Sequence, residues 1–222
     1  MPKVTEEYIQ NKKKMIIDAA YDLCIEKTVS TVTMQDIINK TGLSQGGIYR
    51  FYKDIDEIFG DMLLDMRKRV FIKEKADEIF NQSGEKSAAE MTYKIFDMLA
   101  DFMEEELMGI EKVDFELSVL AMNAPERVEK ILSNNREIGH KEYLINKSME
   151  FFGKKMQQGE NLARASLEEI GTYITSAFSG IQMCCIVNHC YKKNPMSKLY
   201  EPRTQLRTLA KTVNYLLGIE EM

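Results

Sequence analysis

The stretch TVTMQDIINKTGLSQGGIYRFYK, residues 31–53, carries the signals of two short helices joined by a tight turn. Thr33 and Asp36 have capping-box spacing, in which a hydroxyl and an acid three residues later satisfy the free amides at a helix start. Gly42 supplies the turn, and Ser44 can cap the second helix. Two short helices with such a turn make a helix-turn-helix, whose second helix can enter the major groove of DNA.

The second helix, expected to run to about Tyr52, presents side chains suited to DNA. Ile48 and Phe51 stand at i, i+3 and can pack inward, which leaves mainly polar residues outside. Gln and Arg read base edges, hydroxyls bind phosphate oxygens, and glycines let a backbone come close. The predicted DNA contacts are Thr33, Ser44, Gln45, Gly46, Gly47, Tyr49, Arg50, Tyr52 and Lys53.

Residues 33–59 resemble the DNA-binding signature of the TetR family of bacterial transcriptional regulators, roughly T-x-x-x-I-A-x-x-A-G-V-S-x-G-x-L-Y-x-Y-F-x-x-K-E-x-L. The matching positions are Thr33, Ile37, Gly42, Ser44, Gly46, Tyr49, Lys53 and Glu57, with the pair Ala19-Ala20 upstream. The departures are the reversed order Phe51-Tyr52, Gly47 for a small polar residue, and Thr28 for a helix-ending glycine. The rest of the chain matches this family by length and helical pattern only.

Composition favours a mainly helical, soluble protein: the 222 residues include no Trp and four Pro, and their net charge is −5. Residues 1–54 hold eight Lys or Arg against seven Asp or Glu, so the excess acid follows them. An acidic body repels DNA except at the face that binds it, which suits a site-specific reader. We find no signal peptide or apolar run of spanning length, and expect a cytoplasmic protein with no membrane partner.

The pattern predicts an all-α fold of about nine helices. Three form a helix-turn-helix DNA-binding domain over residues 1–53, and about six form a ligand-binding and dimerisation domain over 54–222. Apart from the two short helices, the expected ranges are 6–27, 54–80, 87–107, 113–122, 125–158, 166–191 and 203–217.

The last two helices are predicted to form a homodimer interface, because the TetR resemblance implies a four-helix bundle made by two such helices from each protomer. Small residues recur every four positions at Ser176, Gly180 and Cys184, and the final helix has an apolar stripe that includes Leu206, Leu209 and Val213. The alternative is burial of both faces inside one chain.

Fifteen methionines suggest a flexible, apolar binding cavity, since Met adapts to varied apolar partners. The predicted ligand pocket is Met62, Met66, Leu99, Phe102, Phe115, Met122, Tyr143 and Phe178. The alternative is that these side chains only fill core gaps. Asp114 and Glu116 would suit a cationic ligand if they were buried.

Two further clusters have competing interpretations. Cys184, Cys185, His189 and Cys190 crowd one helix, where packing of free thiols is favoured over a metal or redox site. The run 12–14 of three lysines can contact phosphate or lie solvated. We expect no metal and no cofactor.

The leading hypothesis is a dimeric repressor that a hydrophobic small molecule releases from double-stranded operator DNA. An enzyme is disfavoured because His140 and His189 are far apart and no phosphate loop or nucleophile motif occurs. The other alternative is a ligand-independent DNA-binding or protein-interaction factor with the same fold.

Overall fold

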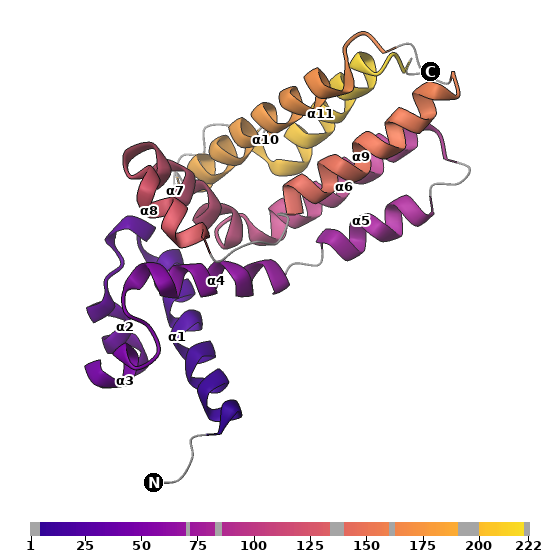
Figure 1. Cartoon of the computed structure of the whole chain (residues 1–222). Coiled ribbons are helices and arrows are strands. Elements are labelled where there is room, and N and C mark those ends of the chain that lie inside the picture. Colours follow the sequence, from indigo (N-terminus) through magenta and orange to yellow (C-terminus); the bar gives the residue numbers. More distant parts are fainter. Residues whose placement is uncertain are drawn as a thin grey trace. The chain divides into compact units, whose positions relative to one another are not determined.

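The computed structural model describes residues 5–69, 72–82, 86–133, 140–159, 163–190 and 200–219. These residues form α-helices joined by turns, with one 3₁₀ turn, η1 (Val29–Thr31), so the predicted all-α fold is confirmed (Figure 1). The chain divides into two compact units. The first unit is Met1–Arg69 with Met108–Glu137, and the second unit is Val70–Leu107 with Ile138–Met222.

Each unit is therefore built from two separate segments of the chain. The helices of the first unit are α1 (Glu6–Glu26), α2 (Met34–Thr41), α3 (Gln45–Tyr49), α4 (Ile55–Arg69), α7 (Ile110–Asn123) and α8 (Pro125–Leu132). Those of the second unit are α5 (Ile72–Asn81), α6 (Ala88–Glu106), α9 (His140–Gln157), α10 (Leu167–Cys190) and α11 (Pro202–Leu216). This division by packing differs from the functional boundary after Lys53, which stays a prediction.

Two of the predicted long helices are described as pairs. The range 54–80 contains α4 and α5, which belong to different units, with residues 70–71 outside the described part. The range 125–158 contains α8 and α9. Helix α8 ends where the hydroxyl of Ser133 donates to the carbonyl of Lys130 at 2.7 Å, because a serine bonded back to the main chain competes with helix continuation.

The core of the first unit gathers apolar side chains from nearly all of its helices. Ile16 of α1, Ile37 of α2, Ile48 of α3 and Phe59 of α4 are fully buried, and Val113 of α7 joins them. Because α2 and α3 are only eight and five residues long, they are too short to be stable alone. Their fold depends on this shared core.

The second unit packs α11 against both α6 and α10, and α9 against α5 and α10 (Figure 1). Buried apolar residues of α11 recur at helical spacing, from Leu206 through Leu209 and Val213. At the rim of the contact with α6, Arg203 pairs with Asp101 and with Glu104, the latter at 2.8 Å. Exposed ion pairs of this kind add little energy, so burial of the stripe holds α11 in place.

Helix α10 is long and apolar enough to cross a membrane by length and composition alone, so the expectation that the chain has no apolar run of spanning length is wrong. Only 33% of this apolar window is buried within the chain. A single helix with these properties also arises where an apolar face packs against another chain. The exposed face of α10 is therefore relevant to how this protein packs against a second chain.

Candidate functional site

The turn between α2 and α3 has the features that its sequence predicts. The hydroxyl of Thr33 accepts from the amide of Asp36 at 3.2 Å, and the Asp36 carboxylate accepts from the amide of Thr33 at 2.8 Å, which completes the capping box. Gly42 ends α2 with φ = 67°, a left-handed conformation that favours glycine. The Ser44 hydroxyl then caps α3 by accepting from the amide of Gly47 at 3.1 Å.

Helix α3 turns one face inward and leaves the rest in solvent. Ile48 is fully buried, while Gln45, Gly46 and Arg50 are exposed and the ring of Tyr49 is 45% exposed. Amide and guanidinium groups on such a face match the base edges of the major groove. Thr33, Ser44 and Lys53 are also exposed, and Gly47 is partly covered.

Tyr52 differs from the other predicted DNA contacts. It is 3% exposed, and its hydroxyl donates to the carboxylate of Asp61 at 2.9 Å. Burial, together with the charge of Asp61, raises the pKa of this phenol. In the reversed pair Phe51-Tyr52 the second ring is thus the buried one, and Tyr52 anchors α3 to α4 instead of facing DNA.

The lysine run of α1 is largely paired within the unit. The ammonium of Lys13 lies 3.2 Å from Asp61 and 5.0 Å from the centre of the Tyr52 ring. Lys14 pairs with Asp18 at 2.6 Å and with Asp65 at 3.5 Å. Of the two interpretations, these contacts favour a role in joining α1 to α4 over a free phosphate-binding cluster.

The start of α4 is fixed from both sides. Its capping residue Asp54 accepts from the amides of Asp56 and Glu57 at 3.0 and 3.1 Å. From α8, Lys130 pairs with Asp54 at 2.6 Å and Arg127 pairs with Asp56 at 2.8 Å. Because α4 begins shortly after α3 ends, α8 supports the position of α3.

Helix α7 makes a second connection to the helix-turn-helix. Lys112 donates to the carbonyl of Cys24 at the end of α1 at 2.7 Å, and it pairs with Glu116 at 3.0 Å. Glu116 in turn accepts from the amide of Val29 at 2.7 Å. Glu116 is therefore occupied within the protein and is not a free partner for the cationic ligand considered from the sequence. Asp114, the second acidic residue considered for a cationic ligand, is only partly buried.

The second unit contains an apolar cavity of about 80 Å³. Residues of α6, α9, α10 and α11 line it, with Leu167 and Ile170 at the start of α10: Thr92, Ile95, Phe96, Leu99, Leu144, Ile145, Ser148, Met149, Phe152, Leu167, Ile170, Gly171, Ile174, Val213 and Leu217. Thr92 and Ser148 are the polar side chains of this lining, and no charged residue belongs to it. Such a wall suits uncharged, apolar molecules.

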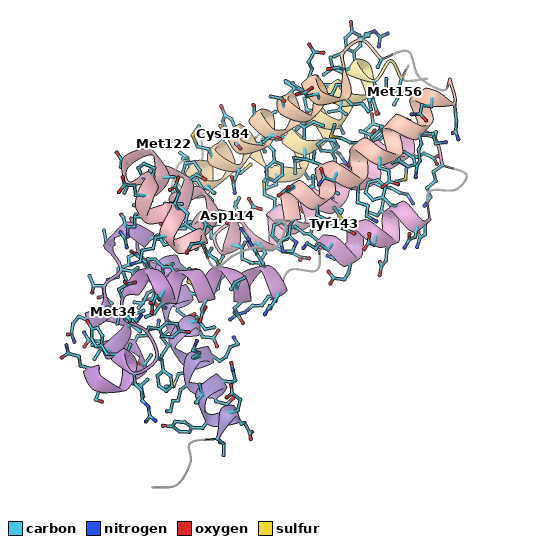
Figure 2. All side chains as sticks on the ribbon, viewed as in Figure 1. Met34, Asp114, Met122, Tyr143, Met156 and Cys184 are labelled. Carbon is cyan, nitrogen blue, oxygen red and sulfur yellow. The ribbon has the colours of Figure 1, made fainter. Side chains whose placement is uncertain are left out.

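Of the eight predicted pocket residues, Leu99 lines this cavity. Met62 and Met66 are buried in the core of the first unit instead. Met122 is 79% exposed at the end of α7, and Tyr143 donates to Asp77 on α5 (Figure 2). The other predicted members are Phe102, Phe115 and Phe178, and they lie outside the lining. Residues of a packed core and residues that line a cavity recur with the same helical periodicity. The sequence pattern therefore could not distinguish the cavity lining from the core.

The predicted dimer residues fall into two groups. On α10, Ser176 and Gly180 are exposed and Cys184, which Figure 2 labels, is partly exposed. On α11, Leu206, Leu209 and Val213 are buried within the chain, so the intramolecular alternative holds for that stripe.

From Thr172 to Met183 the exposed face of α10 carries no charged side chain, and its serine and threonine hydroxyls are already paired, whereas the exposed Glu168 and Glu169 lie in the first turn. Exposed residues on this face include Tyr173, Met183 and a series of small polar residues. The hydroxyls of Thr175, Ser176 and Ser179 each donate to the carbonyl four residues earlier, at 2.9–3.0 Å. Hydroxyls paired in this way lose little when water is removed, so the face can be buried at low cost.

Two of the four cysteines are packed inside the protein, whereas Cys184 is partly exposed and Cys190 is exposed. Cys24 and Cys185 are buried, and burial raises the pKa of the Cys185 thiol to about 11. A thiol with a raised pKa is a poor nucleophile and metal ligand. In the part of the chain that the structure describes, no group of three or more His, Cys, Asp or Glu residues is placed to hold a metal ion.

Comparisons with known proteins agree with this arrangement. Residues 16–62 match the family model of bacterial regulatory proteins, tetR family. The uncharacterized HTH-type transcriptional regulator YfiR of Bacillus subtilis (strain 168) is 25% identical over 161 residues, which cover 71% of this chain and 70% of that protein.

Two solved structures share the fold over nearly their whole length. Salmonella enterica GusR is 17% identical with a TM-score of 0.61, and the match covers 97% of this chain and 98% of that chain. The Thermus thermophilus FadR structure, a TetR-family transcriptional repressor in complex with lauroyl-CoA, is 15% identical with a TM-score of 0.55 and coverages of 95% and 97%. The matched segment contains the capped α2, the glycine turn and the exposed α3, so residues 16–62 form a helix-turn-helix segment of the tetR family of bacterial regulatory proteins.

Proposed function

We propose that this protein is a homodimeric repressor of the TetR family in the cytoplasm, which binds a two-fold operator through α3 and leaves it when a small apolar molecule binds the second unit. The observation that carries the DNA-binding part is the outward face of α3, with Gln45, Tyr49 and Arg50 held by a core that fixes the helix. The uncharged cavity of the second unit supports the ligand-responsive part.

The exposed face of α10 supports assembly as a dimer. A two-fold dimer through this face would present two copies of α3 to half-sites about one helical turn, 34–36 Å, apart or a multiple of it. One copy of a five-residue recognition helix reads too few base pairs for a unique site. The dimer supplies both site length and affinity.

A ligand-responsive repressor requires that the ligand and the operator each weaken the binding of the other. If a ligand lowers operator affinity by some factor, operator must lower ligand affinity by the same factor, and a coupling of about 5–150-fold is ordinary. The lauroyl-CoA complex of the FadR neighbour supports an apolar effector, although the lining here has no charged group to hold a phosphate.

The test begins with selection of bound fragments from random double-stranded DNA at a stated salt concentration. We expect enrichment of an inverted repeat. Apolar compounds are then titrated into the purified protein with and without the enriched DNA. Reciprocal weakening supports the proposal, whereas equal ligand affinity in both titrations would leave a ligand-independent DNA-binding protein. Failure to enrich any sequence would overturn the operator-binding proposal itself.

A further inference from the structure

The apolar cavity of the second unit is closed on one side and open on the other. The closed side is formed by α6 and α11, whose lining residues are all buried: Thr92, Ile95, Phe96, Leu99, Val213 and Leu217. The lining residues that are at least partly exposed all belong to α9 and α10: Ile145, Ser148, Met149, Leu167, Gly171 and Ile174. These six residues form the mouth of the cavity, which therefore lies between α9 and α10.

Gly171 has no side chain at this mouth, and its own chain gives no reason for a glycine there. Glycine inside a helix is less stable than alanine, because its backbone loses more conformational freedom on folding. Gly171 is not among the glycines with positive φ, so its backbone conformation suits any residue. A Cβ added at Gly171 would meet no atom within 4 Å, whereas a Cβ at Gly60 would stand 3.0 Å from a carbonyl oxygen. The space beside Gly171 is therefore open.

The side of α10 on which Gly171 lies distinguishes it from Gly180. The two glycines are about two and a half turns apart, so they point to opposite sides of the helix. Gly180 lies on the exposed face that we propose for the dimer, whereas Gly171 shares the cavity side with Leu167 and Ile174. Close approach of a second chain can account for a glycine at 180 and does not account for one at 171.

The two polar side chains of the lining differ in position. Thr92 is on the closed side, where its hydroxyl already donates to the carbonyl of Ala88 at 3.0 Å. Ser148 is at the mouth and is partly exposed. A polar group of a ligand would lose its hydration without replacement on the closed side, whereas water and Ser148 are available at the mouth. A ligand is therefore expected to enter with an apolar end first.

The size of the cavity favours a narrow molecule. Its volume is about 80 Å³, roughly half of the ~150 Å³ of an apolar cavity that holds a benzene ring. An unbranched chain can occupy so small a space and continue past Gly171 into the open mouth.

We infer that Gly171 keeps the mouth between α9 and α10 open, and that the cavity takes an unbranched apolar chain with one polar end through it. The inference rests on the proposed ligand-responsive function and names the class of ligand. The apolar end lies against the closed side, with Phe96 and Leu217, and the polar end stays at the mouth beside Ser148.

Three six-carbon probes test the ligand class: 1-hexanol, 1,6-hexanediol and cyclohexanol. Their dissociation constants are measured by calorimetry on the full-length protein. We expect 1-hexanol to bind most tightly. The diol has the same length, and it should bind about tenfold more weakly or worse, because its second hydroxyl must be buried on the closed side. Cyclohexanol should also bind more weakly than 1-hexanol, because its ring is wider than the chain.

Variants of two glycines on the same helix test the mouth. Gly171→Leu should weaken 1-hexanol binding about tenfold or more, because exclusion of two methylene groups from the protein already costs that factor. Gly171→Ala should weaken it less and should raise the melting temperature of the ligand-free protein. The matched control Gly180→Ala also adds a Cβ that meets nothing within 4 Å, and it should leave the affinity for 1-hexanol unchanged. Ser148→Ala should weaken 1-hexanol less than Gly171→Leu does, since water can replace the hydroxyl at the mouth.

Four results would overturn the inference. They are absence of 1-hexanol binding, equal or tighter binding of the diol or of cyclohexanol, unchanged 1-hexanol affinity in both Gly171 variants, and loss of the dimer in light scattering for Gly171→Ala. A titration of 1-hexanol into the parent protein with and without the enriched operator DNA tests the proposed function separately. Binding that depends on Gly171 but is equal in both titrations would keep the cavity mouth and remove the ligand-responsive function.

Discussion

Replacement of Gly60 on α4 by alanine should weaken the packing between α4 and α8 that supports α3, although the substitution is not on α3. A Cβ added at Gly60 would stand 3.0 Å from the main-chain carbonyl oxygen of Ile131 on α8. A main-chain atom of a helix cannot rotate away, so α4 and α8 must separate by a few tenths of an ångström. Overpacking of this kind costs about 1–3 kcal/mol. The better helix propensity of alanine returns about 1 kcal/mol, which leaves a net loss of about 1 kcal/mol.

The matched control is Gly46→Ala in the same unit, where an added Cβ meets no atom within 4 Å. It should keep or slightly raise the free energy of unfolding. Urea unfolding followed by circular dichroism measures both variants, and amide hydrogen exchange over α8 locates the effect. We expect faster exchange in α8 for Gly60→Ala alone. Equal stability of the two variants, with unchanged exchange in α8, would refute the close contact between α4 and α8.

Further predictions concern DNA readout, acid stability and assembly. Arg50→Ala should weaken binding to the selected operator by about 1–3 kcal/mol and relax the preference at one base pair. Lys53→Ala should weaken binding to all DNA sequences alike and lower the slope of log affinity against log salt concentration by about one unit. An equal loss of affinity for specific and random DNA in Arg50→Ala would exclude the base contact. Hydrogen bonds from Lys27 and from the capping residue Thr33 lower the pKa of Asp36 from 3.8 to about 2. The ionised Asp36 carboxylate therefore stabilises the fold fully above pH 3.8, and this stabilisation is lost as the pH falls towards 2. The melting temperature of Asp36→Asn, measured against pH, should lack this acid-dependent decrease. Gly180→Leu should abolish the dimer in light scattering and leave the folded monomer intact, because a Cβ there meets nothing within 4 Å in its own chain; an unchanged dimer would argue against this face as the interface.

Local signals were the predictable part of the structure. The capping box at Thr33 and Asp36, the left-handed Gly42 and the inward Ile48 each depend on residues a few positions apart, and the structure has all of them. Tyr52 resembles a DNA contact in the sequence because its neighbours are polar and exposed. Its burial depends on Asp61, which lies on another helix, and no short-range pattern contains that information.

Longer-range features were not predictable in the same way. The apolar stripe of α11 is equally suited to packing against a partner or against α6, and the structure shows burial within the chain. Met62 and Met66 have the composition expected of a pocket, although they belong to the core beside the helix-turn-helix. Substituting tryptophan there would therefore disturb the DNA-binding unit and would not report on a ligand. The open space beside Gly171 has no signature in the sequence, because it depends on the helices that surround this glycine.

The discontinuity of the first unit restricts how the proposed DNA specificity of this protein can change. Its core closes only when Val113 and Ile131, which the chain supplies after α6, pack against the N-terminal helices. Recombination that exchanged residues 1–53 alone would place the corresponding helices of another protein against core residues of α7 and α8 that do not match them. A working chimera must carry α7 and α8 along with the N-terminal segment, although the second unit interrupts them in the gene. Single substitutions on the outer face of α3 avoid that requirement, so they offer this chain the shorter evolutionary and engineering route to a new DNA sequence.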